Sequence, residues 1–140
     1  MSEETIAVVP TCVPRDEADL AECAQAVRTF SKTIHLDIDD GIFTSVRTWP
    51  YKEAGVFGAV GLTPLAALSV EVHLMVEEPR RIGAAFAKAG ARTIIGHVEA
   101  FSETPEAHGA LDLWRRSGAQ QVGLALLLDT PVEVEAWDPC

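Results

Sequence analysis

Apolar and polar residues alternate along the chain in short blocks that predict strands followed by helices. Runs rich in β-branched and other apolar residues predict five strands, at Thr5–Pro10, Thr33–Ile38, Val70–Val76, Thr93–Val98 and Gln121–Leu128. Between them, apolar residues at helical spacing predict helices at Asp16–Phe30, Pro79–Ala89 and Pro105–Ser117. An alternation of strands and helices is typical of βαβ units and therefore predicts a parallel sheet.

Boundary residues support two of these helices. Pro79 suits a first helical position, and Gly90 suits the end of the same helix. Thr104 is predicted to cap the start of the next helix, which Gly118 ends. The region Thr44–Leu68 is less regular and holds three glycines, so we predict a long loop there with at most a short helix.

The number of predicted units leaves two architectures open. A chain of 140 residues is one domain by length. An eight-unit barrel needs about 250 residues, or roughly 30 for each unit. This chain supplies five strands and the start of a fifth helix, predicted at Pro131–Trp137. The prediction is therefore either an open α/β sheet or the first part of a barrel.

Composition and charge narrow the classes of function. With 48% hydrophobic residues the chain is expected to fold. Its formal net charge of −10 disfavours nucleic acid, but a phosphorylated metabolite stays open because a helix N-terminus or a metal can bind phosphate locally. We expect no membrane span, because no apolar run reaches about 18 residues. The acidic start and the three cysteines without CxxC spacing predict a cytoplasmic protein.

The sequence TIHLDIDDG places ionisable residues inside a predicted strand. His35, Asp37 and Asp39 share one face, because alternate residues of a strand point the same way. In VEVHLM, His73 shares a face with Met75 near the end of the next strand. Burying such charges is costly unless water, a partner side chain or a cation neutralises them.

The position of these residues predicts a metal site. Ligands bind α/β folds at the carboxyl ends of parallel strands, and His35, Asp37 and His73 all fall near such ends. Imidazole and carboxylate together suit a divalent zinc, iron or manganese ion. The alternative is a purely structural, hydrogen-bonded role for the three residues.

Other residues of the region have simpler explanations. His97 and Glu99 share a face in GHVEA, but a single histidine at a strand end is more often hydrogen-bonded than a ligand. Glu99 is expected to bind a neighbouring backbone group or Arg92. His108 lies in a helical stretch and is expected at the solvated surface, and spacing alone favours core packing for Met75.

Several segments resemble ribulose-phosphate 3-epimerases and occur in the same order. They are IHLDIDDGIF, VEVHLMVEEPRRIGAAFAKAGARTIIGHVEA and VGLALLLDTPVEV, and the opening VVPTCVPRDEADL is similar to the first strand of that family. The resemblance covers Ile6–Val134. Its most specific part is the pair formed by HxD…DG and VHLM…P.

The resemblance implies a ribulose-phosphate-binding TIM barrel that moves a proton at carbon 3 of a pentulose 5-phosphate. In that family a divalent metal polarises the ketone and stabilises the enediolate, while two aspartates exchange the acid and base roles. The matching positions imply His35, Asp37 and His73 as metal ligands, with Asp37 also as one acid/base. Thr11 stands at a substrate-contacting serine position, and Met75 matches a methionine that packs over the enediolate.

The chain departs from the family pattern at four places. Asp39 replaces a methionine and adds a negative charge beside the site. LLLDTP replaces the family's xNPxTP, and Trp49–Tyr51 with the glycine-rich loop replaces the usual approach to the second helix. The sequence also stops before strands six to eight, which in the family carry the second catalytic aspartate and the phosphate-binding amides.

Two functional interpretations follow. The first is an incomplete ribulose-phosphate 3-epimerase-like isomerase, a truncated single domain over residues 1–140 with about five of eight barrel units. The second is a non-catalytic metal- or sugar-phosphate-binding half-barrel that works with a partner, either a further copy in a homo-oligomer or a completing chain. An aldolase or decarboxylase of the same superfamily is disfavoured, because those resemble a pattern with a lysine between aspartates and Asp37–Asp40 has none.

Overall fold

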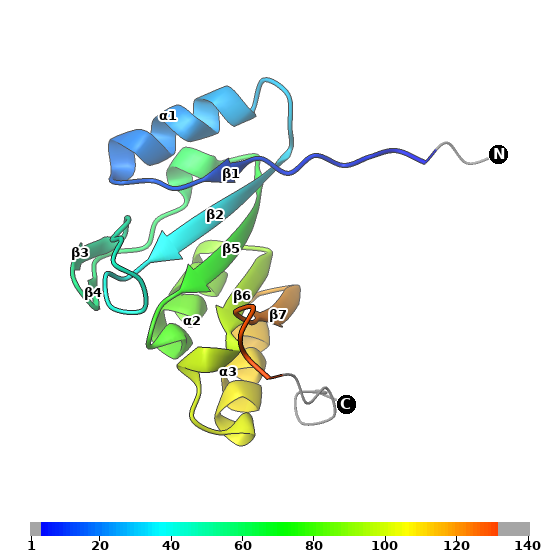
Figure 1. Cartoon of the computed structure of the whole chain (residues 1–140). Coiled ribbons are helices and arrows are strands. Elements are labelled where there is room, and N and C mark those ends of the chain that lie inside the picture. The colour runs from blue at the N-terminus through cyan, green and yellow to red at the C-terminus, as the bar shows by residue number, and fades with distance from the viewer. Residues whose placement is uncertain (1–3, 132–140) are drawn as a thin grey trace.

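A computed structural model describes residues 4–131, which form a five-stranded parallel sheet packed against helices (Figure 1). The order of its strands is β1-β2-β5-β6-β7. These strands are β1 (Thr11–Cys12), β2 (Thr33–Asp39), β5 (Ser69–Met75), β6 (Thr93–His97) and β7 (Gln121–Ala125). The α-helices are α1 (Glu17–Val27), α2 (Pro79–Ala89) and α3 (Thr104–Arg116).

The strands of this sheet follow one another in chain order. Every neighbouring pair is parallel. A doubly wound sheet reverses its strand order part-way across, whereas strands added one after another in one direction are the arrangement of a (β/α) barrel. The predicted parallel α/β fold with five strands, of partial TIM-barrel type, is confirmed.

The helices begin and end close to the predicted residues. The prediction for α2 is confirmed, and Gly90 ends that helix with a left-handed backbone, at φ 111°. Helix α3 differs by one position at its start: Thr104 is its first residue and Glu103 is the N-cap. Glu103 takes this place because its carbonyl already accepts the first helical hydrogen bonds. Within residues 4–131, no helix has the length and apolar character needed to cross a membrane.

The predicted first strand, Thr5–Pro10, is wrong. Strand β1 consists of the two following residues only, with Thr11 opposite His35. In this register the first residue of β2, Thr33, lies level with Val9, so the residues before Val9 extend past the start of β2. An apolar sequence alone does not form a strand where no neighbouring backbone supplies hydrogen bonds.

The predicted loop Thr44–Leu68 is more structured than expected. It contains a two-stranded antiparallel hairpin, which the sequence pattern did not reveal, and one short 3-10 helix. The hairpin strands are β3 (Tyr51–Glu53) and β4 (Val56–Phe57). The 3-10 helices of the described chain are η1 (Thr63–Leu65) and η2 (Val98–Ala100).

The last strand is shorter than predicted. β7 ends at Ala125, and Leu126–Leu128 follow it with exposed side chains. It stops there because β6 itself ends at His97, which lies opposite Ala125. The predicted helix Pro131–Trp137 lies outside the described residues, apart from Pro131 itself.

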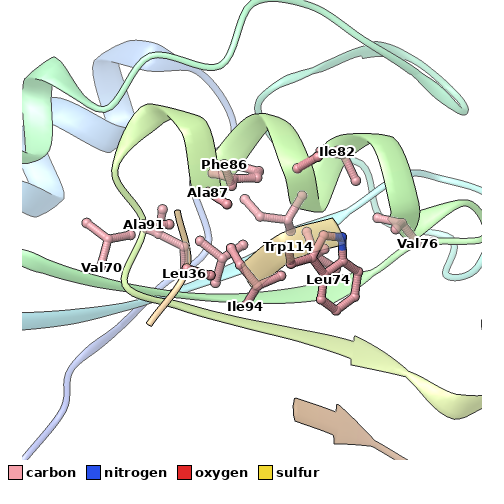
Figure 2. Packing of buried hydrophobic residues seen from close by; sticks show 14 of the residues in the cluster. Leu36, Val70, Leu74, Val76, Ile82, Phe86, Ala87, Ala91, Ile94 and Trp114 are labelled. Carbon is pink, nitrogen blue, oxygen red and sulfur yellow. The ribbon is translucent and has the colours of Figure 1, made fainter. Parts of the chain in front are cut away.

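The hydrophobic core lies between the helices and one face of the sheet. Leu36, Leu74 and Ile94 point from neighbouring strands toward α2, whose Ile82 and Phe86 pack against them (Figure 2). The same alternation turns the residues between these positions to the other face of the sheet. The core therefore leaves the polar strand residues together on the face away from the helices.

Trp114 of α3 is fully buried in this core, and its indole occupies space that is free only because two neighbouring residues are glycines. Its indole Nε1 donates a hydrogen bond of 3.1 Å to the carbonyl of Arg80. A Cβ atom added to Gly83 would lie 2.3 Å from Nε1, and one added to Gly96 would lie 2.8 Å from the far edge of the indole. The indole is fixed by its hydrogen bond, so it cannot move aside cheaply.

Substitution of Gly83 by alanine is expected to lower the free energy of unfolding by about 2 kcal/mol through overpacking. Gly109→Ala in α3 is the matched control, because its added Cβ meets only the flexible end of Arg80, at 3.1 Å. Glycine is unfavourable inside a helix, so Gly109→Ala should raise the free energy of unfolding by about 0.5–1 kcal/mol. Chemical denaturation measures both. A Gly83→Ala protein as stable as the control would contradict the packing described.

Candidate metal centre

Polar side chains line the sheet face opposite the helices, near the carboxyl ends of three neighbouring strands. In β2, His35 precedes and Asp37 follows the buried Leu36, so both point to the face that Leu36 does not. His73 on β5 lies directly opposite Asp37, and the adjacent strand β6 ends at His97. Because these strands are parallel, their carboxyl ends meet at one edge of the sheet. The fold thus brings the predicted site residues together.

Asp37 lies between two imidazoles. Its Oδ1 is 3.1 Å from His35 Nε2 and 3.2 Å from His73 Nδ1. One ligand atom from each residue lies within 4.8 Å of the other two, and all three side chains are half-buried. Two imidazole nitrogens and a carboxylate oxygen are a donor set that suits zinc, iron or manganese. The residues present therefore fit a divalent cation.

The far side of each imidazole also has a polar partner. His35 Nδ1 lies 3.2 Å from Glu71 Oε2. His73 Nε2 lies 2.8 Å from His97 Nε2, and His97 Nδ1 lies 3.3 Å from Glu99 Oε2. His97 is hydrogen-bonded, as expected, but its partner is a candidate ligand. The sequence analysis missed Glu71, although its alternation with His73 in VEVHLM could have revealed it.

Glu99 is held by groups that follow β7. The backbone N–H of Leu127 and the hydroxyl of Thr130 donate to its Oε1, the latter at 2.8 Å. The expectation of a backbone partner is thereby confirmed for Leu127. Burial works to raise the pKa of Glu99, but these hydrogen bonds outweigh it and lower the pKa below its ordinary value. Glu99 is therefore a carboxylate at neutral pH.

His73 is kept neutral by its surroundings. Burial lowers the pKa of this imidazole, and the neighbouring His97 lowers it further, against the opposing effect of Asp37. A neutral imidazole has a free lone pair, which metal binding requires. The environment of His73 therefore favours a ligand over a positively charged ion-pair partner.

The chain is similar to known proteins over most of its length. The model of the ribulose-phosphate 3 epimerase family matches residues 7–137. The chain belongs to this family. It is 35% identical over 130 residues to a ribulose-phosphate 3-epimerase of Bacillus subtilis, covering 92% of this chain and 56% of that protein. It is 33% identical over 131 residues to a Synechocystis protein of the same name, covering 93% and 54%.

The match also extends to a plant member of the family. Identity to the chloroplastic ribulose-5-phosphate-3-epimerase of Arabidopsis thaliana is 32% over 132 residues, covering 94% of this chain and 44% of that protein. The chain thus spans about half the length of the curated relatives it matches. The part in common contains the strands that carry His35, Asp37 and His73.

Asp39, the first departure from the family pattern, is buried and hydrogen-bonded to two threonines. Its Oδ1 accepts a hydrogen bond of 2.7 Å from the Thr44 hydroxyl, and its backbone N–H donates to the Thr48 hydroxyl. Burial raises the pKa of Asp39, against the effect of Thr44 and with a smaller contribution from Asp37. Asp39 thus has its own hydroxyl partner.

The two positions implied to contact substrate lie on the site side of the sheet. Thr11 on β1 is exposed and lies opposite His35. Met75 lies opposite Asp39 and is half-buried on the same face as His73. Core packing, which spacing alone favoured for Met75, is therefore wrong, because the hydrophobic core fills the other face of the sheet.

The expectation for His108 is also wrong. The side chain is half-buried rather than solvated, and its Nε2 is buried with no hydrogen-bond partner among the described residues. The reason is its place on α3, where it neighbours the buried Leu111 three residues later at the edge of the packed face. His108 takes no part in the metal centre.

Proposed function

We propose that this chain supplies the metal-binding part of a ribulose-phosphate 3-epimerase-type active site, within one partial barrel domain over residues 1–140. The observation that supports the proposal is the convergence of His35, Asp37 and His73, with ligand atoms within 4.8 Å of one another. The substrate class is a pentulose 5-phosphate, in keeping with the name of the Arabidopsis relative. The reaction is proton transfer at carbon 3 of that sugar.

Each residue has a distinct task in this proposal. His35 and His73 hold a divalent zinc, iron or manganese ion together with Asp37, which also takes the proton from carbon 3. The ion, when bound, polarises the ketone and stabilises the negative charge that develops as the proton leaves. Without such stabilisation a carboxylate is too weak a base for this step. Thr11 and Met75 contact the substrate from β1 and β5.

The proposal predicts proton exchange at carbon 3 of ribulose 5-phosphate in D2O. The chain is loaded with zinc, iron or manganese, and deuterium incorporation is followed by NMR. Because Asp37 can act on one face only, we expect exchange with little formation of xylulose 5-phosphate by this chain alone. Exchange that is absent with all three metals, in a protein that binds them, would contradict an isomerase site.

A binding role with a partner is the second candidate, and the sheet edges favour it. In the described part of the chain, β1 and β7 each pair with a strand on one side only. Exposed apolar residues flank these strands in the sequence: Ile6, before β1, is 91% exposed, and Leu128, after β7, is 99% exposed. Open apolar edges of this kind are sites of strand pairing between chains. The occupant would be a second copy or a completing chain.

The two candidates differ in a measurable way. A binding protein would keep one metal ion per chain and gain thermal stability with a pentulose 5-phosphate, because any ligand of the folded state stabilises it. It would show no exchange at carbon 3. Analytical ultracentrifugation with and without metal then reports whether the open edges pair two copies of the chain.

A further inference from the structure

We infer that Glu99, acting through His97, is a positioning residue that keeps the proton of His73 on Nε2 and so leaves Nδ1 free for the cation. The inference rests on the proposed metal site and extends it to residues outside the three ligands. It follows from which nitrogen atoms face each other and from what each partner can donate or accept.

The starting point is the orientation of His73. Its Nδ1 lies 3.2 Å from Asp37 Oδ1, so Nδ1 is the nitrogen that faces the cation position. Its Nε2 lies 2.8 Å from Nε2 of His97. At this distance one nitrogen carries the shared proton and the other presents its lone pair. The tautomer of His73 is therefore fixed by the tautomer of His97.

Glu99 decides the tautomer of His97. Nδ1 of His97 lies 3.3 Å from Glu99 Oε2, and a carboxylate can only accept. His97 therefore carries its proton on Nδ1 and presents a lone pair at Nε2. His73 must then donate from Nε2, which leaves the lone pair of its Nδ1 for the cation. All three groups are satisfied without an additional proton.

The carboxylate is anchored firmly enough for this task. Leu127 N–H and the Thr130 hydroxyl both donate to Oε1 of Glu99, which leaves Oε2 for His97. His97 is only 5% exposed, and the Phe43 ring lies 5.2 Å from it between ring centroids. Water therefore has little access to His97 and cannot readily replace Glu99 as the acceptor of its Nδ1–H group. The arrangement joins β5, β6 and the segment after β7.

The imidazole of His35 also lies between Asp37 and a second carboxylate. His35 turns Nε2 toward Asp37, at 3.1 Å, and Nδ1 toward Glu71 Oε2, at 3.2 Å. The Glu71 carboxylate thus faces Nδ1 directly, without an intervening histidine. A carboxylate behind each imidazole orients the ring, and loss of such a partner typically costs about 10–100-fold in metal affinity.

The decisive variant is Glu99→Gln. Leu127 and Thr130 would continue to donate to the amide oxygen, so the NH2 group would face His97 Nδ1. His97 would then carry its proton on Nε2 and oppose the proton of His73. We expect 15N NMR of histidine-labelled protein to show His97 as the Nδ1–H tautomer in the wild type, with and without zinc, and as the Nε2–H tautomer in Glu99→Gln. Zinc affinity should fall about 10–100-fold.

Two further variants separate this role from a general effect on stability. Glu103→Gln is the matched control, because Glu103 is exposed and its side chain makes no capping hydrogen bond. It should leave both the tautomer and the zinc affinity unchanged. His97→Phe should weaken zinc binding about as much as Glu99→Gln, and the double variant no more than His97→Phe alone, because Glu99 acts through His97.

Each outcome has a defined meaning. A wild-type His97 protonated on Nε2, or a Glu99→Gln protein with the zinc affinity of Glu103→Gln, would overturn the inference. Additive losses in the double variant would overturn it as well. A wild-type protein that binds none of zinc, iron and manganese, yet shows His97 as the Nδ1–H tautomer, would overturn the proposed function and leave the assignment of the protons supported.

Discussion

Replacing His73 with alanine is expected to weaken divalent cation binding by more than about 100-fold. The substitution removes Nδ1, one of the three ligand atoms, and leaves only His35 and Asp37 on β2. Loss of an outer partner costs about 10–100-fold, so loss of a ligand should cost more. Zinc affinity is measured by competition with a chromophoric chelator. At zinc concentrations 100 times Kd, the wild type should also gain about 2.7 kcal/mol of stability, which His73→Ala should lack.

The matched control for this prediction is His108→Ala. His108 is a half-buried histidine on α3 that takes no part in the metal centre. The control should bind zinc as the wild type does, so a general effect of removing a histidine can be recognised. Equal zinc affinities for the wild type and His73→Ala would place the cation elsewhere and remove the basis of the proposed function.

The fold could be predicted from the sequence where local signals decide the structure. Helix α2 is such a case, because Pro79 favours its start and Gly90 supplies the left-handed residue at its end. Strand β1 is the opposite case. The apolar residues of Thr5–Pro10 predicted a strand, but pairing depends on the register with β2, which sets Thr11 opposite His35. Register between distant segments is not encoded in the apolar pattern of either one.

The candidate site could also be predicted only in part. Alternation along two strands identified His35, Asp37 and His73, since residues two apart share a face. The contact between His73 and His97 joins residues on different strands, and the orientation of each ring follows from packing. Alternation in VEVHLM puts Glu71 on the same face as His73, but its place beside the His35 imidazole depends on the pairing of β2 with β5. Residue type and spacing therefore predict ligands more readily than the groups that orient them.

Asp37 has two tasks in the proposed site, and they make different demands on the side chain. As a ligand it needs an oxygen atom directed between His35 and His73, which the present geometry provides. As a base it needs a negative charge and a lone pair that can accept a proton. An asparagine keeps the oxygen atom and the shape but cannot accept the proton. Asp37→Asn therefore tests the second task while preserving part of the first.

With metal at saturating concentration, Asp37→Asn is expected to slow deuterium exchange at carbon 3 by about 10²–10⁴-fold, the usual contribution of a general base. Exchange is followed by NMR in D2O, and zinc affinity is measured separately so that weaker loading is not mistaken for lost chemistry. Asp112→Asn, an exposed aspartate paired with Arg116 on α3, is the matched control and should exchange as the wild type does. Unchanged exchange in metal-loaded Asp37→Asn would contradict the role of Asp37 as the base and would indicate that another carboxylate on this face accepts the proton. Asp39→Asn would then identify Asp39 as that base if it abolished exchange.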